Sequence, residues 1–308
     1  MTFGLEKVES RKYLIHQINT SLMKSVRNFF EILNKSKSGL CVGIDPDFAK
    51  ILEVSNSRPE SEDNFFSPNQ KGKVVFNFCF DIMKKTADYA GAFKFNTAFF
   101  ESFEKGEETL NQLILNSKAH FDHVVNIGDS KNADIGNTNI KYAEKMFRKY
   151  GFDAMTTNPY LGEPSGLLSE GDILDGRCII PVLLTTNSEA KLVQKLKLED
   201  GRYLYEEIGR QISEWSVTAN CGVVIGATAD GMDFSKACEA TGNRFVLIPG
   251  VGAQGGSLEM CVNAVLKNNP DRLFLVNSSR EIIYSGDPKA QAKKLYDQIN
   301  MQLPKGDA

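Results

Sequence analysis

Short apolar segments rich in β-branched residues alternate along the chain with longer segments whose apolar positions recur with a helical period. The short segments predict eight buried strands: Leu40–Ile44, Gly91–Asn96, Val124–Gly128, Asp153–Thr157, Cys178–Leu184, Gly222–Ala227, Arg244–Ile248 and Arg272–Val276. The longer segments predict helices at Val75–Tyr89, Thr109–Ala119, Ile140–Tyr150, Tyr203–Thr218, Leu258–Leu266 and Ala290–Ile299. Strands buried on both faces and separated by amphipathic helices form a parallel sheet covered by helices. Eight such units predict an α/β fold of the closed (β/α)8, or TIM barrel, type.

Two segments lie outside this alternation. The apolar pattern of Ile15–Leu33 predicts a leading helix that packs over the N-terminal face of the barrel. The segment Ser55–Lys73 is rich in Ser, Asn, Glu, Lys and Pro, which indicates a surface insertion. Because no shift in composition marks a second unit, one domain spanning residues 1–308 is expected.

Composition and charge disfavour several classes of protein. The formal net charge is -3, whereas general nucleic-acid binders are usually basic. None of the six cysteines forms a C-x-x-C pair, so we expect buried free thiols in a reducing compartment. No apolar stretch approaches the about 20 residues that a membrane helix needs, and the N-terminus is charged. We therefore expect a cytoplasmic protein without a membrane segment.

Charged residues directly follow the third predicted strand. Asp129 and Lys131 share one face of an extended chain, because side chains alternate with a period of two. Asp134 has the opposite parity and is expected past a bend, in the loop before a helix that begins near Asn137. Taken singly, these residues also fit a solvated turn, since Asp, Asn and Thr often cap helices. Their position favours chemistry, because barrel enzymes place active sites at the carboxyl ends of strands.

Two other strands carry polar residues at the same end. The first strand leads into Asp45, and the second carries Lys94 and Asn96 on one face. A buried lysine is costly unless it is paired or functional. Opposite charges ~4 Å apart attract by about 4 kcal/mol at an effective dielectric of about 20. We therefore expect one array of alternating charge in a partly dry pocket, made of Lys94, Asp129, Lys131 and Asp134.

The last two strands lead into an expected anion site. Pro249–Gly256 is rich in glycine, and Asn277–Arg280 follows the eighth strand. Loops after strands seven and eight of such barrels often bind phosphate, and glycines let backbone N–H groups approach the anion. The expected phosphate contacts are Gly252, Gln254, Gly255, Ser279 and Arg280. Two other interpretations of this loop remain. It fits a dinucleotide-binding G-x-G-x-x-G pattern, although no βαβ half follows it, and it also fits a plain glycine-rich turn.

Six motifs together resemble one family. The segment Asp129-x-Lys131-x-x-Asp134-Ile-Gly-Asn-Thr138 resembles the signature of the orotidine 5'-phosphate decarboxylases. Further matches, in the family's order and typical of its longer-chain branch, are Val42–Pro46, Phe93–Asn96, Thr156–Gly162, Pro249–Gly256 and Asn277–Arg280. Two positions depart from that branch. Thr185–Ser188 lacks the proline common after strand five, and Asn132 replaces a common arginine.

The resemblance implies an enzyme without cofactor or metal that converts orotidine 5'-monophosphate to UMP and CO2, the last step of de novo UMP biosynthesis. Lys131 would protonate the pyrimidine C6, with Asp129 and Asp134 positioning it. Asp129 would also lie beside the substrate carboxylate, and Lys94 near the ribose. The other implied substrate contacts are Asp45 at a ribose hydroxyl, Asn96, Thr186 at the base, and Gln254 and Arg280 at the phosphate.

The resemblance also implies a homodimer with shared active sites, in which Asp134 and Thr138 serve the neighbouring subunit. Association with a separate orotate phosphoribosyltransferase is left open, because the chain shows no second domain for that reaction.

Two other classes of protein remain. One is a metal-dependent sugar-phosphate decarboxylase or aldol-type synthase with a similar Asp-x-Lys-x-x-Asp motif, and the other is a non-catalytic nucleotide-binding barrel. No histidine lies in the strand-end motifs, which disfavours a histidine metal site or a Ser-His-Asp triad.

Overall fold

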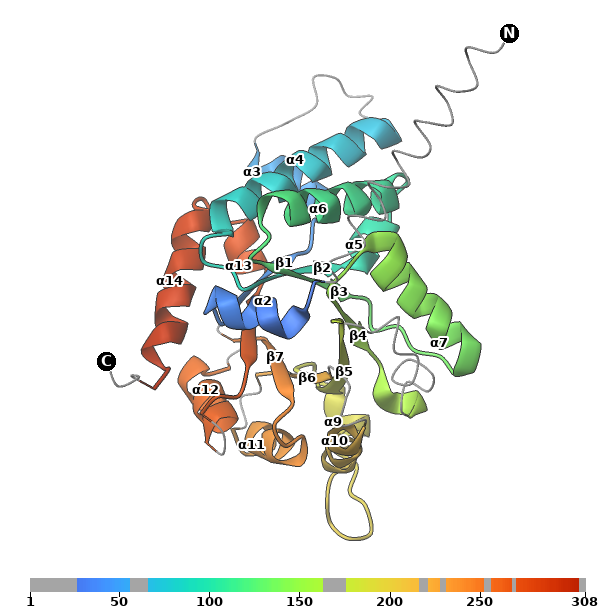
Figure 1. The fold of residues 1–308 in the computed structure, drawn as a ribbon, viewed down its shortest axis with the longest axis vertical. Helices are drawn as coiled ribbons and strands as arrows, with labels where there is room; N and C mark the ends of the chain where they lie inside the picture. Colours follow the sequence, from blue (N-terminus) through green and yellow to red (C-terminus); the bar gives the residue numbers. More distant parts are fainter. Residues whose placement is uncertain are drawn as a thin grey trace.

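The computed structural model describes residues 27–55, 66–162, 176–215, 221–227, 231–251, 256–267 and 270–304. Within these residues eight parallel strands close into a barrel, each paired with the next along the chain and β1 paired with β8 (Figure 1). The strands are β1 Leu40–Ile44, β2 Ala92–Asn96, β3 Val125–Asp129, β4 Ala154–Thr157, β5 Cys178–Leu184, β6 Gly222–Ile225, β7 Phe245–Pro249 and β8 Phe274–Ser278. The predicted (β/α)8 fold is confirmed, and each strand lies within two residues of its expected bounds.

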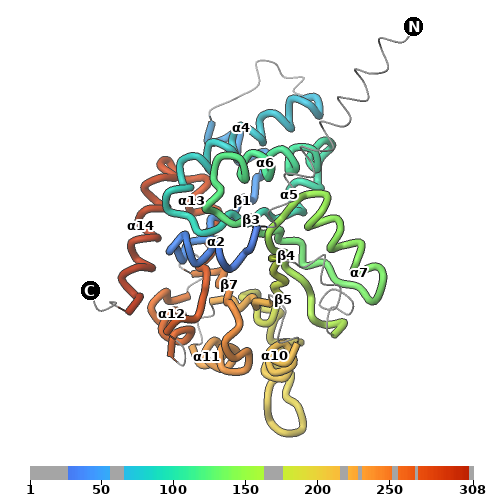
Figure 2. The backbone as a smooth tube through the Cα atoms, in the orientation of Figure 1, coloured from blue at the N-terminus to red at the C-terminus, as the bar shows by residue number. Residues whose placement is uncertain are grey.

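Helices surround the barrel (Figure 2). Those described are α2 Phe29–Ser36, α3 Phe48–Val54, α4 Pro68–Thr86, α5 Thr97–Glu101, α6 Gly106–His120, α7 Gly136–Ala143, α9 Ala190–Val193, α10 Leu204–Glu214, α11 Gly231–Ala240, α12 Leu258–Leu266, α13 Arg280–Ile283 and α14 Pro288–Met301. A π-helix, Glu144–Tyr150, continues α7, and a 3-10 turn, Pro159–Leu161, follows β4. The predicted helix Ile140–Tyr150 is therefore present, but its second half has wider turns and ends at Gly151, whose φ is +81°.

The leading helix is shorter than predicted. Helix α2 begins at Phe29, because the Asn28 side chain caps it by accepting the backbone N–H groups of Phe30 and Glu31. Arg27 and Asn28 thus precede the helix, and residues 15–26 of the predicted helix lie outside the described part. The predicted location is confirmed for the described portion. Phe29 packs against Phe245, the first residue of β7, so α2 covers the N-terminal end of the barrel.

The predicted insertion at Ser55–Lys73 is partly wrong. Residues 68–73 form the first turns of α4, which starts with a proline and a capping box. The Ser67 hydroxyl accepts the Gln70 N–H at 3.3 Å, and the Gln70 side chain accepts the Ser67 N–H at 2.9 Å. Ser55 caps the end of α3, and residues 56–65 lie outside the described part.

Two apolar cores position the strand ends. Alternate strand residues such as Val125, Ile127 and Ile180 fill the barrel interior, while Phe93 and Phe95 pack outward beneath the helices. By the same alternation Lys94 on β2, Asp129 on β3 and Thr156 on β4 face inward at the carboxyl end of the barrel, where they form a polar layer. The six cysteines are buried and unpaired, as expected.

Candidate active site

Two lysines share the carboxylate of Asp129 at the carboxyl end of the barrel. Asp129 is the last residue of β3, and Lys94 projects inward from the adjacent strand β2. The Nζ of Lys94 lies 2.7 Å from Asp129 Oδ2, and the Nζ of Lys131 lies 2.5 Å from Oδ1. The Lys94 side chain is 7% exposed, whereas that of Lys131 is 51% exposed. The array therefore has a buried anchor and one lysine that can reach a ligand.

Mutual attraction keeps the buried pair charged. Burial lowers the pKa of Lys94, but the carboxylates of Asp129 and Asp45 outweigh it and hold that pKa well above its ordinary value. Burial raises the pKa of Asp129, but Lys94 and Lys131 outweigh it and hold that pKa well below its usual range. Lys94 is thus an ammonium and Asp129 a carboxylate at neutral pH.

Thr156 joins this array, although we expected no role for it. It lies on β4 and is 1% exposed. Its hydroxyl donates to Asp129 Oδ1 at 2.9 Å and accepts the backbone N–H of Lys131 at 3.0 Å. Strand parity could have found it, because Thr156 follows the inward-facing Ala154 by two residues.

Within one chain Asp134 does not join Lys94, Asp129 and Lys131, and its expected place in the neighbouring subunit's site stays a prediction. Its carboxylate accepts the N–H of Ile135 at 2.7 Å, and its own N–H binds the Asn139 side chain at 3.0 Å. No ion pair links it to a described residue of the same chain. It lies just before α7, on which Thr138 is exposed. The bend predicted after Lys131 therefore carries Asp134 away from the lysines.

Asp45 and Asn96 flank the array from β1 and β2. One carboxylate oxygen of Asp45, Oδ1, is buried and has no hydrogen-bond partner among the described residues. Its backbone oxygen accepts the Tyr284 hydroxyl at 2.9 Å. The Asn96 side chain accepts the N–H of Ala98 at 3.3 Å and so begins α5. Asp45 therefore has a free acceptor beside Lys94, while the Asn96 oxygen already serves as a helix cap.

The expected phosphate end is described in part. Ser279 precedes α13, which begins at Arg280, and the Arg280 side chain is exposed. Ser279 packs over Gly43 of β1 so closely that a Cβ there would lie 1.8 Å from the serine Oγ. Val251 and Gly256 form a parallel bridge that draws the ends of the glycine loop together. Three predicted contacts, Gly252, Gln254 and Gly255, lie outside the described residues.

The loop after β5 has a defined shape without the family's proline. The Gln194 side chain accepts the N–H of Thr185 at 2.9 Å and donates to its hydroxyl at 2.9 Å. The methyl group of Thr186 packs against Gly226, where a Cβ would lie 2.7 Å away. A glutamine from α9's C-terminus thus holds the loop that carries Thr186.

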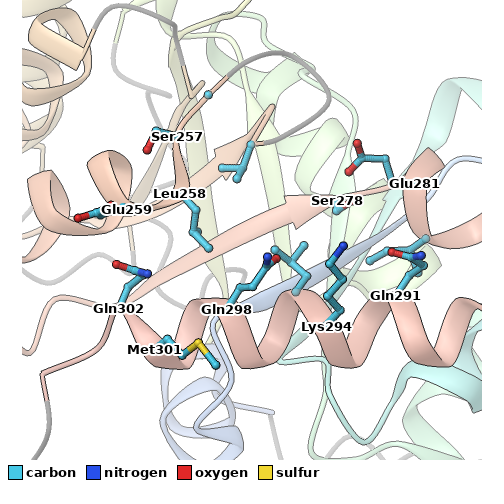
Figure 3. Close-up of a pocket in the computed structure, with 14 residues that line it drawn as sticks. Ser257, Leu258, Glu259, Ser278, Glu281, Gln291, Lys294, Gln298, Met301 and Gln302 are labelled. Carbon is cyan, nitrogen blue, oxygen red and sulfur yellow. The ribbon is translucent and has the colours of Figure 1, made fainter.

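Among the described residues, several cavities adjoin this end of the barrel, and two of them bear on the site. One of about 260 Å³ is lined by Lys131, Asn158, Tyr160 and Gln194, among others. A larger one of about 830 Å³ lies between α12, α13 and α14, where Lys294 and Gln298 face Leu258 (Figure 3). The larger cavity is not lined by Lys94, Asp129 or Lys131, so it is separate from the charged array.

The closed parallel barrel and the lysine–carboxylate array at the ends of its strands place the chain among (β/α)8-barrel enzymes. A family model described as "Orotidine 5'-phosphate decarboxylase / HUMPS family" matches residues 38–295. The chain belongs to this family.

Three known proteins illustrate what the chain is similar to, each over most of its length. The orotidine 5'-phosphate decarboxylase of Bacteroides fragilis is 33% identical over 290 residues, covering 90% of this chain and 97% of that protein. The structure of Leishmania donovani OMP decarboxylase matches with a TM-score of 0.73 and 29% identity, covering 89% of this chain and 98% of that one. Leishmania donovani UMP synthase matches with a TM-score of 0.74 and 30% identity, covering 90% of this chain and 57% of that one. Among the described residues, no helix has the length and apolar character needed to cross a membrane.

Proposed function

We propose that this chain decarboxylates orotidine 5'-monophosphate to UMP and CO2. The observation that carries the proposal is the array in which Asp129 binds Lys94 and Lys131 at the open end of the barrel. Relatives named orotidine 5'-phosphate decarboxylase, 33% and 35% identical to the chain, support it.

The array supplies a proton where the reaction needs one. As the bond between C6 and the carboxylate breaks, its electron pair stays on C6, and the Lys131 ammonium donates a proton to that carbon. A fixed ammonium stabilises this developing charge without reorganisation, which is how preorganised sites lower barriers. Asp129 would lie beside the departing carboxylate and hold Lys131 in place, and Lys94 keeps Asp129 ionised.

The remaining contacts would hold the nucleotide at a distance from the reacting carbon. The unpartnered oxygen of Asp45 suits a ribose hydroxyl, and Thr186 offers a hydroxyl to the base. Asn96 would contribute its amide N–H group. We assign the phosphate to Arg280, Ser279 and the loop with Gly252, Gln254 and Gly255. Binding energy from a remote phosphate can be used to orient the reacting group.

We further propose a homodimer in which Asp134 and Thr138 complete the neighbour's site. Asp134 accepts the backbone N–H of Ile135 and makes no ion pair with a described residue. Ile135 and Tyr160, from the loops after β3 and β4, are 67% and 73% exposed. Large exposed apolar side chains of this kind favour a contact with another protein surface.

The substrate of this reaction would come from an orotate phosphoribosyltransferase reaction. The UMP synthase of Leishmania donovani is matched over 57% of its length, so part of that chain has no counterpart in the match. We propose that the matched residues act as one cytoplasmic catalytic domain, and that an orotate phosphoribosyltransferase, which makes the substrate, can associate with it.

The direct test is to measure UMP and CO2 formation from orotidine 5'-monophosphate with and without EDTA. Equal turnover in both samples is expected. Loss of turnover with the chelator would favour a metal-dependent sugar-phosphate decarboxylase or aldol-type synthase of the same barrel type. Tight UMP binding without turnover would favour the non-catalytic barrel.

A further inference from the structure

The Thr156 hydroxyl makes two hydrogen bonds whose directions are both determined. The backbone N–H of Lys131 can only donate, so the hydroxyl oxygen accepts that bond at 3.0 Å. Its single hydrogen is then left for the carboxylate of Asp129, 2.9 Å away. One buried side chain therefore links the carboxylate to the main chain of the lysine.

This hydroxyl is the rigid partner of the Asp129 carboxylate. The other two partners, Lys94 and Lys131, reach it at the ends of long, rotatable side chains. Thr156 is β-branched, sits on a barrel strand and has few accessible rotamers. It is therefore the partner that sets the orientation of the Asp129 carboxylate plane, and the two lysine side chains can rotate to meet the carboxylate in that orientation.

The same residue supports an unusual backbone at Lys131. The φ angle of Lys131 is +52°, in the left-handed region that non-glycine residues seldom adopt. Its N–H is held by the Thr156 hydroxyl, and the neighbouring Ser130 hydroxyl donates to the Thr156 backbone oxygen at 3.3 Å. This backbone conformation sets the direction in which the Lys131 side chain leaves the chain, and its ammonium lies 2.5 Å from Asp129 Oδ1.

We propose that Thr156 is a positioning residue for proton transfer, fixing both the Asp129 carboxylate and the Lys131 backbone through its hydroxyl. The proposal rests on the decarboxylase function proposed above. It predicts an effect on the chemical step with little effect on nucleotide binding, because the proposed phosphate contacts follow β7 and β8 and do not include β4.

The test compares Thr156→Val, which removes the hydroxyl and keeps the shape, with Thr156→Ser, which keeps the hydroxyl. Thr157→Val is the matched control, since this buried neighbour on β4 has the opposite parity. We expect Thr156→Val to lower kcat about 100-fold, the loss typical of a small misplacement of a reacting group. In Thr156→Val, KM and the affinity for UMP should change less than about threefold. The kcat values of Thr156→Ser and Thr157→Val should stay within about fivefold of the wild-type value.

The outcomes separate this proposal from the proposed function. An inactive wild-type chain would contradict the decarboxylase assignment itself. An active wild type with near-normal kcat in Thr156→Val would overturn the positioning role alone. An equal loss in Thr157→Val, or a loss in Thr156→Ser as large as in Thr156→Val, would also overturn it. If Thr156→Val fails to fold, Thr156→Ala takes its place with the same expected loss of kcat.

Discussion

The two carboxylate oxygens of Asp129 each bind a different lysine, and these lysines differ in burial. Lys94 is buried and binds Oδ2, while the half-exposed Lys131 binds Oδ1. The buried lysine is therefore suited to holding the carboxylate, and the exposed one to meeting a substrate.

Replacing Lys131 tests whether it is the lysine that acts on the substrate. Lys131→Ala should abolish decarboxylation, because the proton donor is lost, while UMP binding survives through the phosphate contacts. Turnover measures the first effect and calorimetric titration with UMP the second. Turnover near the wild-type level in this variant would contradict the role given to Lys131.

The stability of the protein should depend on the Asp129 charge in acid. The folded-state pKa of Asp129 is lowered, so its contribution is complete above the unfolded-state value of about 4 and is lost as the pH falls through the folded-state pKa. Asp129→Asn should lower the free energy of unfolding at pH 7 by about 3 kcal/mol, because it leaves Lys94 without its buried partner. Denaturant unfolding at several pH values would measure both proteins. The two curves should begin to approach each other below about pH 4 and continue to do so as the pH falls toward the folded-state pKa of Asp129, and a constant difference down to pH 2 would refute the assignment.

At the level of elements, a close contact at the rim of the barrel joins the strand β1 to the residue before α13. Gly43 on β1 leaves space for Ser279, so the start of α13 folds over the rim of the barrel. Gly43→Ala should push Ser279 and Arg280 outward and raise KM about tenfold, with a smaller effect on kcat. The double variant Gly43→Ala/Ser279→Gly removes the clash and should lower KM again in the same steady-state assay, to the value of Ser279→Gly alone, which lacks only the hydroxyl proposed to contact the phosphate. A single variant with normal KM would show that this packing does not position the phosphate end.

Much of this element-level arrangement could be predicted from the sequence. Strand bounds and the convergence of Lys94 with Asp129 followed from apolar runs and side-chain parity, which are local properties. The bend before Asp134 was also predicted from parity, but not that it separates Asp134 from the lysines of its own chain. The role of Thr156 was not predicted, because it depends on contact between residues 25 or more positions apart. The start of α4 was readable from Ser67, Pro68 and Gln70, but the polar composition of the segment suggested a loop.

At the level of the whole molecule, the proposed dimer accounts for Asp134, which makes no ion pair with a described residue of its own chain. Mixing Lys131→Ala and Asp134→Ala subunits should give heterodimers with one intact and one doubly defective site. Random exchange would restore roughly a quarter of the wild-type activity, because half of the dimers are mixed and each has one working site. The assay is turnover after co-refolding, with each variant alone as the baseline. Verified heterodimers without activity would contradict the shared site.

Two of the charged groups in the array, Lys94 and Asp129, are carried by barrel strands and not by loops. Rim segments could therefore change in length or composition during evolution while the proton-delivery apparatus kept its geometry. Substrate preference and reaction chemistry would then be separable traits in this scaffold, one mutable at the periphery and the other built into the wall of the barrel.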